Sequence, residues 1–179
     1  MSLFLATLIT GIFLVALGLA LALANAQAGA ALKAIPRSSS AAVIFFGGGS
    51  IWFLANVWNL SPADFGDFHL PLFVAFGLIA VLAFRLVPDF LAVRGVCLLA
   101  LLAAMPLLDA AYMRYEHPQR LFLVTFVYIS IVLSIWFAVQ PWRVRDFIAW
   151  LLARPGRGRG LGGLLAAYGL LLCALAFTY

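Results

Sequence analysis

The sequence predicts an all-α, polytopic membrane protein with six transmembrane helices and one short interfacial helix. Hydrophobic residues make up 66% of the 179 residues and charged residues only 9%, with a mean hydropathy of +1.15. A typical soluble domain has about 25% charged residues. The apolar residues also gather into six segments, each close to the roughly 20 residues that a helix needs to cross the hydrocarbon core. We therefore expect a single transmembrane domain over residues 1–179.

The six expected spans cover residues 3–26, 41–60, 70–87, 90–113, 121–140 and 161–179. The end of the first span, Ala24-Asn25-Ala26, resembles a signal-peptidase site. However, no Lys or Arg precedes the apolar run, and the run is longer than the roughly 7–15 residues of a signal peptide. We interpret it as a retained helix. Because no proline occurs before Pro36, this helix could continue out of the bilayer through Lys33.

Residues 142–154, between the fifth and sixth spans, are too short to cross a membrane. Arg143, Asp146, Trp150 and Arg154 share one side at helical spacing, and apolar residues share the other. This segregation predicts an interfacial helix on the cytoplasmic leaflet. Residues 155–160, which alternate glycine and arginine after a proline, are expected to form a flexible basic link.

The distribution of positive charge predicts an orientation. With the N-terminus outside, nine Lys and Arg residues fall in inner loops and two in outer loops. The nine are Lys33, Arg37, Arg85, Arg94, Arg143, Arg145, Arg154, Arg157 and Arg159, and the two are Arg114 and Arg120. Because positive loops stay in the cytoplasm, we expect a bacterial inner-membrane protein with both termini in the periplasm. The net charge of +5 then indicates contact with anionic headgroups on the cytoplasmic face, and not nucleic-acid binding.

The residues that usually carry catalysis are sparse. Cys97 and Cys173 lie inside apolar spans without CxxC spacing, which gives no metal or redox signal. His69 and His117 lie in expected outer loops, and the sequence has no HExxH, GxSxG or Walker motif. We therefore expect no enzyme activity and no metal or cofactor.

Asp109 is the strongest candidate for a functional polar residue. It lies about one turn from the outer end of the fourth span, and an acidic group at membrane depth is costly and often functional. Pro106 cannot donate a hydrogen bond to the carbonyl of Leu102, so a freed carbonyl beside the carboxylate could line a cation or proton path. Alternatively, Asp109 reaches the interface and pairs with Arg114 or with another helix.

The second span holds a cluster of small and polar residues. Gly47, Gly48 and Gly49 would let another backbone approach closely, and Ser50 could form a hydrogen bond across that contact. Alternatively, the glycines form a hinge or a constriction in a pore. Asn56 and Asn59 share nearly one face and could line a polar path or bridge to another helix. Small residues four apart also predict packing stripes on the first and last spans: Ala16, Ala20 and Ala24, and Gly162 and Ala166.

One segment resembles a known family. Pro36-Arg37-Ser38-Ser39, followed by Phe45-Phe46-Gly47-Gly48-Gly49-Ser50-Ile51, is similar to the entrance of the second helix of the urea/amide channels. In that family a Pro-Lys/Arg-Ser turn precedes a Phe-Phe and Gly-Gly run. The resemblance covers about sixteen residues, and it implies six helices, periplasmic termini and a hexamer around pores for small neutral solutes. The family's aromatic motifs in later helices are absent, and Tyr168 stands where the family has an acidic residue in its last helix.

Two functions are compatible with these observations. The first is an accessory, assembly or interaction subunit of a membrane complex, without catalytic machinery, which contacts itself or another membrane protein through its small-residue faces. The second is a small oligomeric channel or transporter for a small neutral solute or an ion. Its candidate path residues are Asp109, Asn56, Asn59 and Ser50.

Overall fold

The computed structural model describes residues 1–61, 63 and 65–179, and within them every regular element is helical. Six helical segments in this part of the chain are long and apolar enough to cross a membrane. They are Leu3–Ala22, Ser39–Trp58, His69–Leu86, Leu91–Ala111, Arg120–Val139 and Gly156–Ala176. The predicted all-α fold class with six spans is confirmed.

The chain divides into two compact units. Unit 1 comprises Met1–Lys33, Ala103–Leu133 and Arg145–Tyr179, and unit 2 comprises Ala34–Leu102 and Ser134–Val144. The boundaries between them fall before the last residue of α2 (Ala26–Ala34) and inside the helices α6 (Leu91–Ala111), α7 (Arg120–Val139) and α8 (Trp142–Leu152). Helix α8 occupies most of the segment expected to form an interfacial helix.

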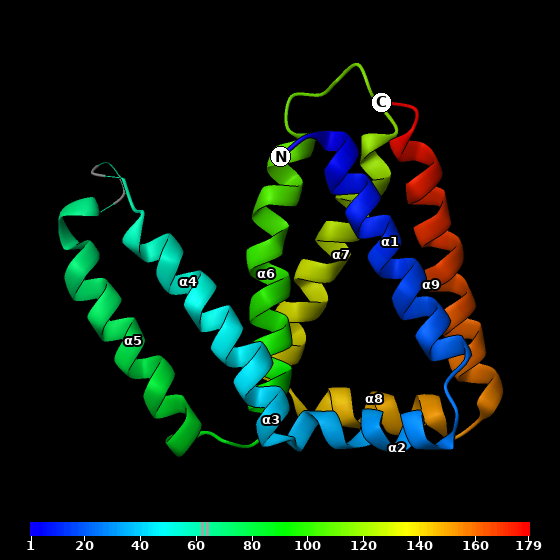
Figure 1. The fold of residues 1–179 in the computed structure, drawn as a ribbon, viewed down its shortest axis with the longest axis horizontal. Coiled ribbons are helices and arrows are strands. Elements are labelled where there is room, and N and C mark those ends of the chain that lie inside the picture. The colour runs from blue at the N-terminus through cyan, green and yellow to red at the C-terminus, as the bar shows by residue number, and fades with distance from the viewer. Residues whose placement is uncertain (62, 64) are drawn as a thin grey trace. The chain divides into compact units, whose positions relative to one another are not determined.

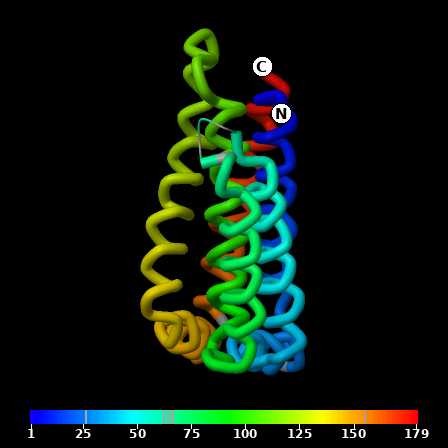
Figure 2. The backbone as a smooth tube through the Cα atoms, turned by 90° about the vertical axis from the view of Figure 1, so that its left-hand side faces the viewer, coloured from blue at the N-terminus to red at the C-terminus, as the bar shows by residue number. Residues whose placement is uncertain are grey.

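Unit 1 is built on two helices, α1 (Leu3–Ala22) and α9 (Pro155–Ala176), which lie side by side in opposite directions (Figures 1 and 2). At the end that holds both termini, the rings of Phe4 and Phe177 meet edge to face with their centroids 5.6 Å apart. The core of the unit joins α1 to the last turns of α6 and the first half of α7. Its buried members are Leu3, Ala6, Ala104, Ala110, Ala111, Leu123 and Val127.

The first helix does not continue to Lys33, so that expectation is wrong. Helix α1 ends at Ala22, and a separate helix, α2 (Ala26–Ala34), follows. The break has a local cause in Asn25, whose side-chain oxygen accepts a hydrogen bond from the backbone N–H of Ala28 at 2.9 Å. This is the role of an N-cap residue, which satisfies a donor that a helix start leaves free.

The predicted flexible link over residues 155–160 is also wrong, because α9 already begins at Pro155. Proline suits the first position of a helix, where its fixed backbone angle is helical and its missing N–H costs nothing. Arg154 precedes it in an extended conformation. The arginines and glycines of this segment therefore lie on the first turns of α9.

Unit 2 contains the second and third spans. The second consists of α3 (Ser39–Ala42), a π-helical turn (Val43–Gly47) and α4 (Gly48–Trp58). The third is α5 (His69–Leu86), which packs against α4 (Figure 1) and has no buried residue. Edge-to-face aromatic pairs join α5 to α4 and to the π-helical turn before it, with centroids 5.1 to 5.5 Å apart. These pairs are Phe46–Phe84, Phe53–Phe76, Trp58–His69 and Trp58–Phe73.

Candidate functional site

Glycines of α1 and α9 bring the backbones of these two helices of unit 1 into close contact. A Cβ atom on Gly18 would lie 2.5 Å from the carbonyl oxygen of Gly162 and 2.5 Å from the backbone nitrogen of Ala166. One heptad away, a Cβ on Gly11 would lie 2.8 Å from the carbonyl oxygen of Gly169. The backbones therefore touch at two levels. Gly162 and Ala166, expected to be packing residues, lie in this contact. Their glycine partners on α1, Gly11 and Gly18, were not predicted, although they are seven residues apart in the sequence.

In unit 2, the glycine that comes closest to a neighbouring backbone lies outside the predicted run. A Cβ on Gly95 of α6 would clash with the backbone of Phe46 in the π-helical turn. By contrast, a Cβ on Gly47 would come no closer than 4.0 Å to the ring of Phe84, and a Cβ on Gly48 would meet nothing within 4 Å. A Cβ on Gly49 would lie 3.0 Å from the flexible side chain of Leu98.

The four candidate path residues have different surroundings. In unit 2, Ser50 is buried, whereas Asn56 and Asn59 are exposed near the end of α4. The amide nitrogen of Asn59 donates a hydrogen bond to the carbonyl of Ala55 at 2.7 Å, so it caps its own helix. In unit 1, Asp109 is exposed in the last turn of α6. The structure thus places Asn56 and Asn59 on the surface of unit 2 and Asp109 on the surface of unit 1.

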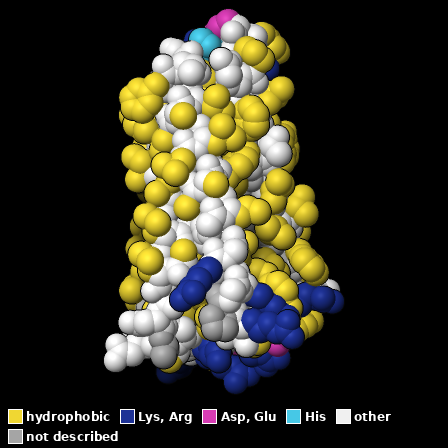
Figure 3. Space-filling view, turned by 90° about the vertical axis from the view of Figure 1, so that its right-hand side faces the viewer, with side chains coloured by type: hydrophobic (Ala, Val, Ile, Leu, Met, Phe, Trp, Pro, Cys, Tyr) yellow, Lys and Arg dark blue, Asp and Glu magenta, His cyan; other side chains and the backbone are white. Residues whose placement is uncertain are grey.

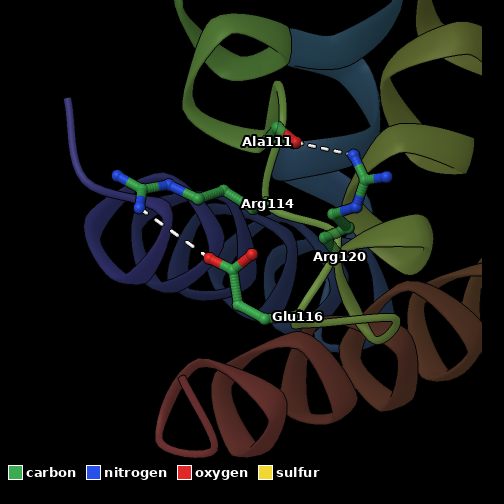
Figure 4. A network of polar contacts seen from close by, with 4 residues as sticks. All are labelled: Ala111, Arg114, Glu116 and Arg120. Atoms are coloured by element: carbon green, nitrogen blue, oxygen red, sulfur yellow. Dashed lines mark hydrogen bonds and ion pairs between the residues drawn. The ribbon is translucent and has the colours of Figure 1, made fainter.

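The loop after α6 holds the arginine that was considered as a partner of Asp109 (Figure 4). Arg114 instead points to Glu116, with a nitrogen–oxygen distance of 3.9 Å in an exposed pair. The guanidinium group of Arg120 donates a hydrogen bond at 2.7 Å to the carbonyl oxygen of Ala111, the last residue of α6. A cation there compensates the negative end of the helix dipole. This loop ends α6, and the carboxylate of Asp109 beside it has no hydrogen-bond partner among the described residues, although the Asp109 backbone carbonyl accepts from the N–H of Tyr112.

Tyr168 replaces the acidic residue that the channel resemblance implies for the last helix. Its hydroxyl group donates a hydrogen bond at 2.8 Å to the carbonyl oxygen of Phe122 in α7. Both residues belong to unit 1. The side chain therefore ties α9 to α7, and its donor is already used within the chain.

A second small-residue stripe on α9 points away from α1. Gly160, Gly163 and Ala167 are exposed, and a Cβ atom on either glycine would meet nothing within 4 Å. On α1, Ala16 and Ala20 of the predicted stripe are exposed as well, but Ala24 lies beyond the end of this helix at Ala22, so the predicted third member is not part of the stripe. Each stripe has the spacing that lets another helix approach closely. The outward stripe on α9 was missed, although its sequence pattern, Gly163-x-x-x-Ala167, was visible.

Taken together, these features define a multi-pass helical membrane protein whose close contacts are made by small residues. Within the described residues, no group of three or more His, Cys, Asp and Glu side chains could hold a metal ion. Comparison with models of protein families, with curated proteins and with solved structures finds no match for the chain.

Proposed function

We propose that the chain is a non-enzymatic subunit of a membrane complex and binds another membrane protein through the outward stripe on α9. The observation that carries this proposal is the exposure of Gly163 beside Ala167. A glycine inside a helix costs up to about 1 kcal/mol relative to alanine. At positions 18 and 162 a close backbone contact offsets this cost, but at position 163 no described residue of the chain does. A partner helix would supply the missing contact.

The test is co-purification. The tagged full-length chain, expressed in its own cells, is extracted in a gentle detergent and weighed by native mass spectrometry. We expect a larger complex that contains a different membrane protein. Replacing Gly163 and Ala167 with leucine should release that partner, because bulky side chains prevent close approach. Ala75→Leu is the matched control for Ala167→Leu, since it makes the same change at an exposed position of another span, α5.

If the chain purifies as a monomer, or only as a homo-oligomer that the leucine variants leave unchanged, the proposed partner binding is wrong. A homo-oligomer that the variants dissociate would mean that the stripe joins copies of the chain. In that case the subunit assignment would also be overturned in favour of self-assembly.

A channel for a small solute is the second candidate, and the π-helical turn at Val43–Gly47 favours it. Such turns break the regular hydrogen-bond pattern and occur frequently at functional sites. This one lies inside the segment that resembles the urea/amide channels and leads directly into Ser50. Proteoliposomes that contain only this chain should then conduct a small neutral solute or an ion. Flux that disappears in Asp109→Asn or Ser50→Ala would support the channel over the subunit.

We further propose an inner-membrane orientation with both termini in the periplasm. Within unit 1, the end with both termini carries Arg114 and Arg120, and the opposite end carries five Lys and Arg residues (Figure 1). This asymmetry supports the proposal, because positive residues are retained in the cytoplasm. A reporter enzyme that is active only in the periplasm should be active when fused after Tyr179. Fused within residues 153–156, it should be inactive.

A further inference from the structure

A cavity of about 460 Å³ opens at the end of unit 1 opposite the termini. Its walls come from four elements: the end of α1, helix α2, the end of α8 and the start of α9. The volume lies within the range of pockets that bind small molecules, roughly 300–1,000 Å³. It is also far larger than the roughly 30 Å³ that one water occupies in the liquid.

Three cations line this cavity, namely Lys33, Arg154 and Arg159. None of the described residues that line it is acidic. The acidic residue on α8, Asp146, already forms an ion pair with Arg145 at 2.8 Å, and neither residue lines the cavity. Figure 3 shows Lys and Arg side chains gathered at the lower end of this face of the molecule, below a wall of apolar side chains. The positive charge of the cavity therefore has no counter-charge from these residues.

Further polar groups of the cavity also suit an anion. The first turn of α9 contains no acidic residue, and Arg154 at its start makes no side-chain capping bond. The positive end of that helix dipole is thus left without a carboxylate. Asn25 uses its side-chain oxygen to cap α2, which leaves its amide nitrogen free to donate, since no described residue accepts from it.

The remaining lining is apolar and lies at the foot of two membrane spans. Leu21 from α1 and Leu151 and Leu152 from α8 face the cavity. A free phosphate ion would gain nothing from these leucines. A phospholipid could place its phosphate among the cations and its glycerol and first acyl carbons against the leucines, where burial of apolar surface is favourable.

We propose that this cavity binds the phosphate headgroup of an anionic phospholipid, with Lys33, Arg154 and Arg159 as its charged ligands. Arg157, which lies between Arg154 and Arg159 in the sequence, has a different role. Its guanidinium group lies 4.5 Å from the centroid of the Trp150 ring and donates a hydrogen bond to the Trp150 carbonyl at 2.9 Å. It ties α9 to α8 and so holds the walls of the cavity together. The inference does not depend on the proposed protein partner.

The test measures lipid binding to the full-length chain in detergent. Native mass spectrometry with phosphatidylglycerol should show one lipid retained per chain, and phosphatidylcholine should be retained at least tenfold less. Arg154→Gln and Arg159→Gln should each weaken phosphatidylglycerol binding about fivefold, the usual contribution of one Lys or Arg near an anionic surface. Arg145→Gln is the matched control, because it removes one cation of the same unit outside the cavity. It should change binding less than twofold.

A second variant separates a cavity from a diffuse positive surface. Gly29 is buried in the cavity wall, where a Cβ would lie 3.6 Å from Leu152. Gly29→Leu fills the space without changing charge and should reduce lipid retention at least tenfold. Each variant is first checked for unchanged helix content by circular dichroism.

Four results would overturn the proposal. The first is an equal effect of Arg145→Gln and Arg154→Gln, which would indicate only net charge. The second is unchanged retention in a folded Gly29→Leu variant. The third is displacement of phosphatidylglycerol by millimolar inorganic phosphate, which would assign the cavity to a free phosphate. An acidic peptide of a co-purified protein found in place of the lipid would refute it equally.

Discussion

The contact between Gly18 and Gly162 makes a direct prediction about stability. In Gly18→Ala, the new methyl group would lie 2.5 Å from two backbone atoms of α9. Ordinary contact begins at 3.4 Å, so the two helices must separate by the difference, 3.4 − 2.5 = 0.9 Å. Backbone atoms cannot rotate away as the end of a side chain can. The strain therefore has to be distributed along the whole α1–α9 contact.

The energy follows from two opposing effects. A gap of 0.5–1 Å forfeits about a quarter to a half of the dispersion energy of the atoms that face it, and overpacking of this kind costs about 1–3 kcal/mol. The higher helix propensity of alanine returns up to about 1 kcal/mol. We expect a net loss of about 1–2 kcal/mol in the free energy of unfolding. Gly162→Ala should behave alike, since its Cβ would lie 2.5 Å from the carbonyl oxygen of Gly18.

The assay is unfolding of the purified chain by SDS in mixed micelles, followed by circular dichroism. Gly163→Ala is the control on the same helix, because its Cβ would meet nothing within 4 Å. It should leave the free energy of unfolding unchanged or raise it by up to about 1 kcal/mol. Equal effects at positions 162 and 163 would refute the reasoning, since neighbouring positions of one helix differ here only in what their Cβ atoms would meet.

Three further predictions concern helix ends and the contact in unit 2, and the same unfolding assay checks each of them. Arg120→Met removes the hydrogen bond and the charge at the end of α6 and should cost about 1–2 kcal/mol; an unchanged midpoint would show that the cap contributes nothing. Met113→Gly relieves a left-handed backbone angle of 56° and should stabilise the chain by about 1 kcal/mol; Met113→Ala should not. Gly95→Ala places a methyl group against the backbone of Phe46 and should cost about 1–3 kcal/mol, whereas Gly48→Ala, into open space, should be neutral.

The spans could be predicted because hydropathy and length act locally. The segment expected over residues 41–60 is Ser39–Trp58 in the structure, and the segment expected over 121–140 is Arg120–Val139. The signals for the missed helix start and helix end were local too. Asn25 is a favourable N-cap residue, but the apolar run before it favoured a continuous helix through Lys33. Pro155 is a favourable first helical residue, but the glycines after it favoured a flexible link.

Spacing alone could not predict which glycines of α9 face α1 and which face outward. Gly162 and Gly163 are neighbours in the sequence and both belong to small-residue patterns, yet one touches α1 and the other points outward. Which small residues of α9 pack inside the chain depends on where the neighbouring helix lies. For Gly162 that neighbour is Gly18 on α1, which is 162 − 18 = 144 residues away in the sequence. The basic cavity is non-local for the same reason, since its cations come from α2, the residue before α9 and α9 itself.

The two glycine sets separate folding from association. Gly18 and Gly162 are used within the chain, so changes there should alter stability whether or not a partner is present. A Cβ on Gly163 would meet none of the described residues, so apart from the helix propensity of the new residue a change there should alter what binds from outside. Without a hydrophobic driving force between helices in lipid, close packing and polar contacts supply most of the affinity. An outward glycine next to an inward one therefore gives α9 two packing faces, and the subunit hypothesis requires only that the second face meet a helix of another chain.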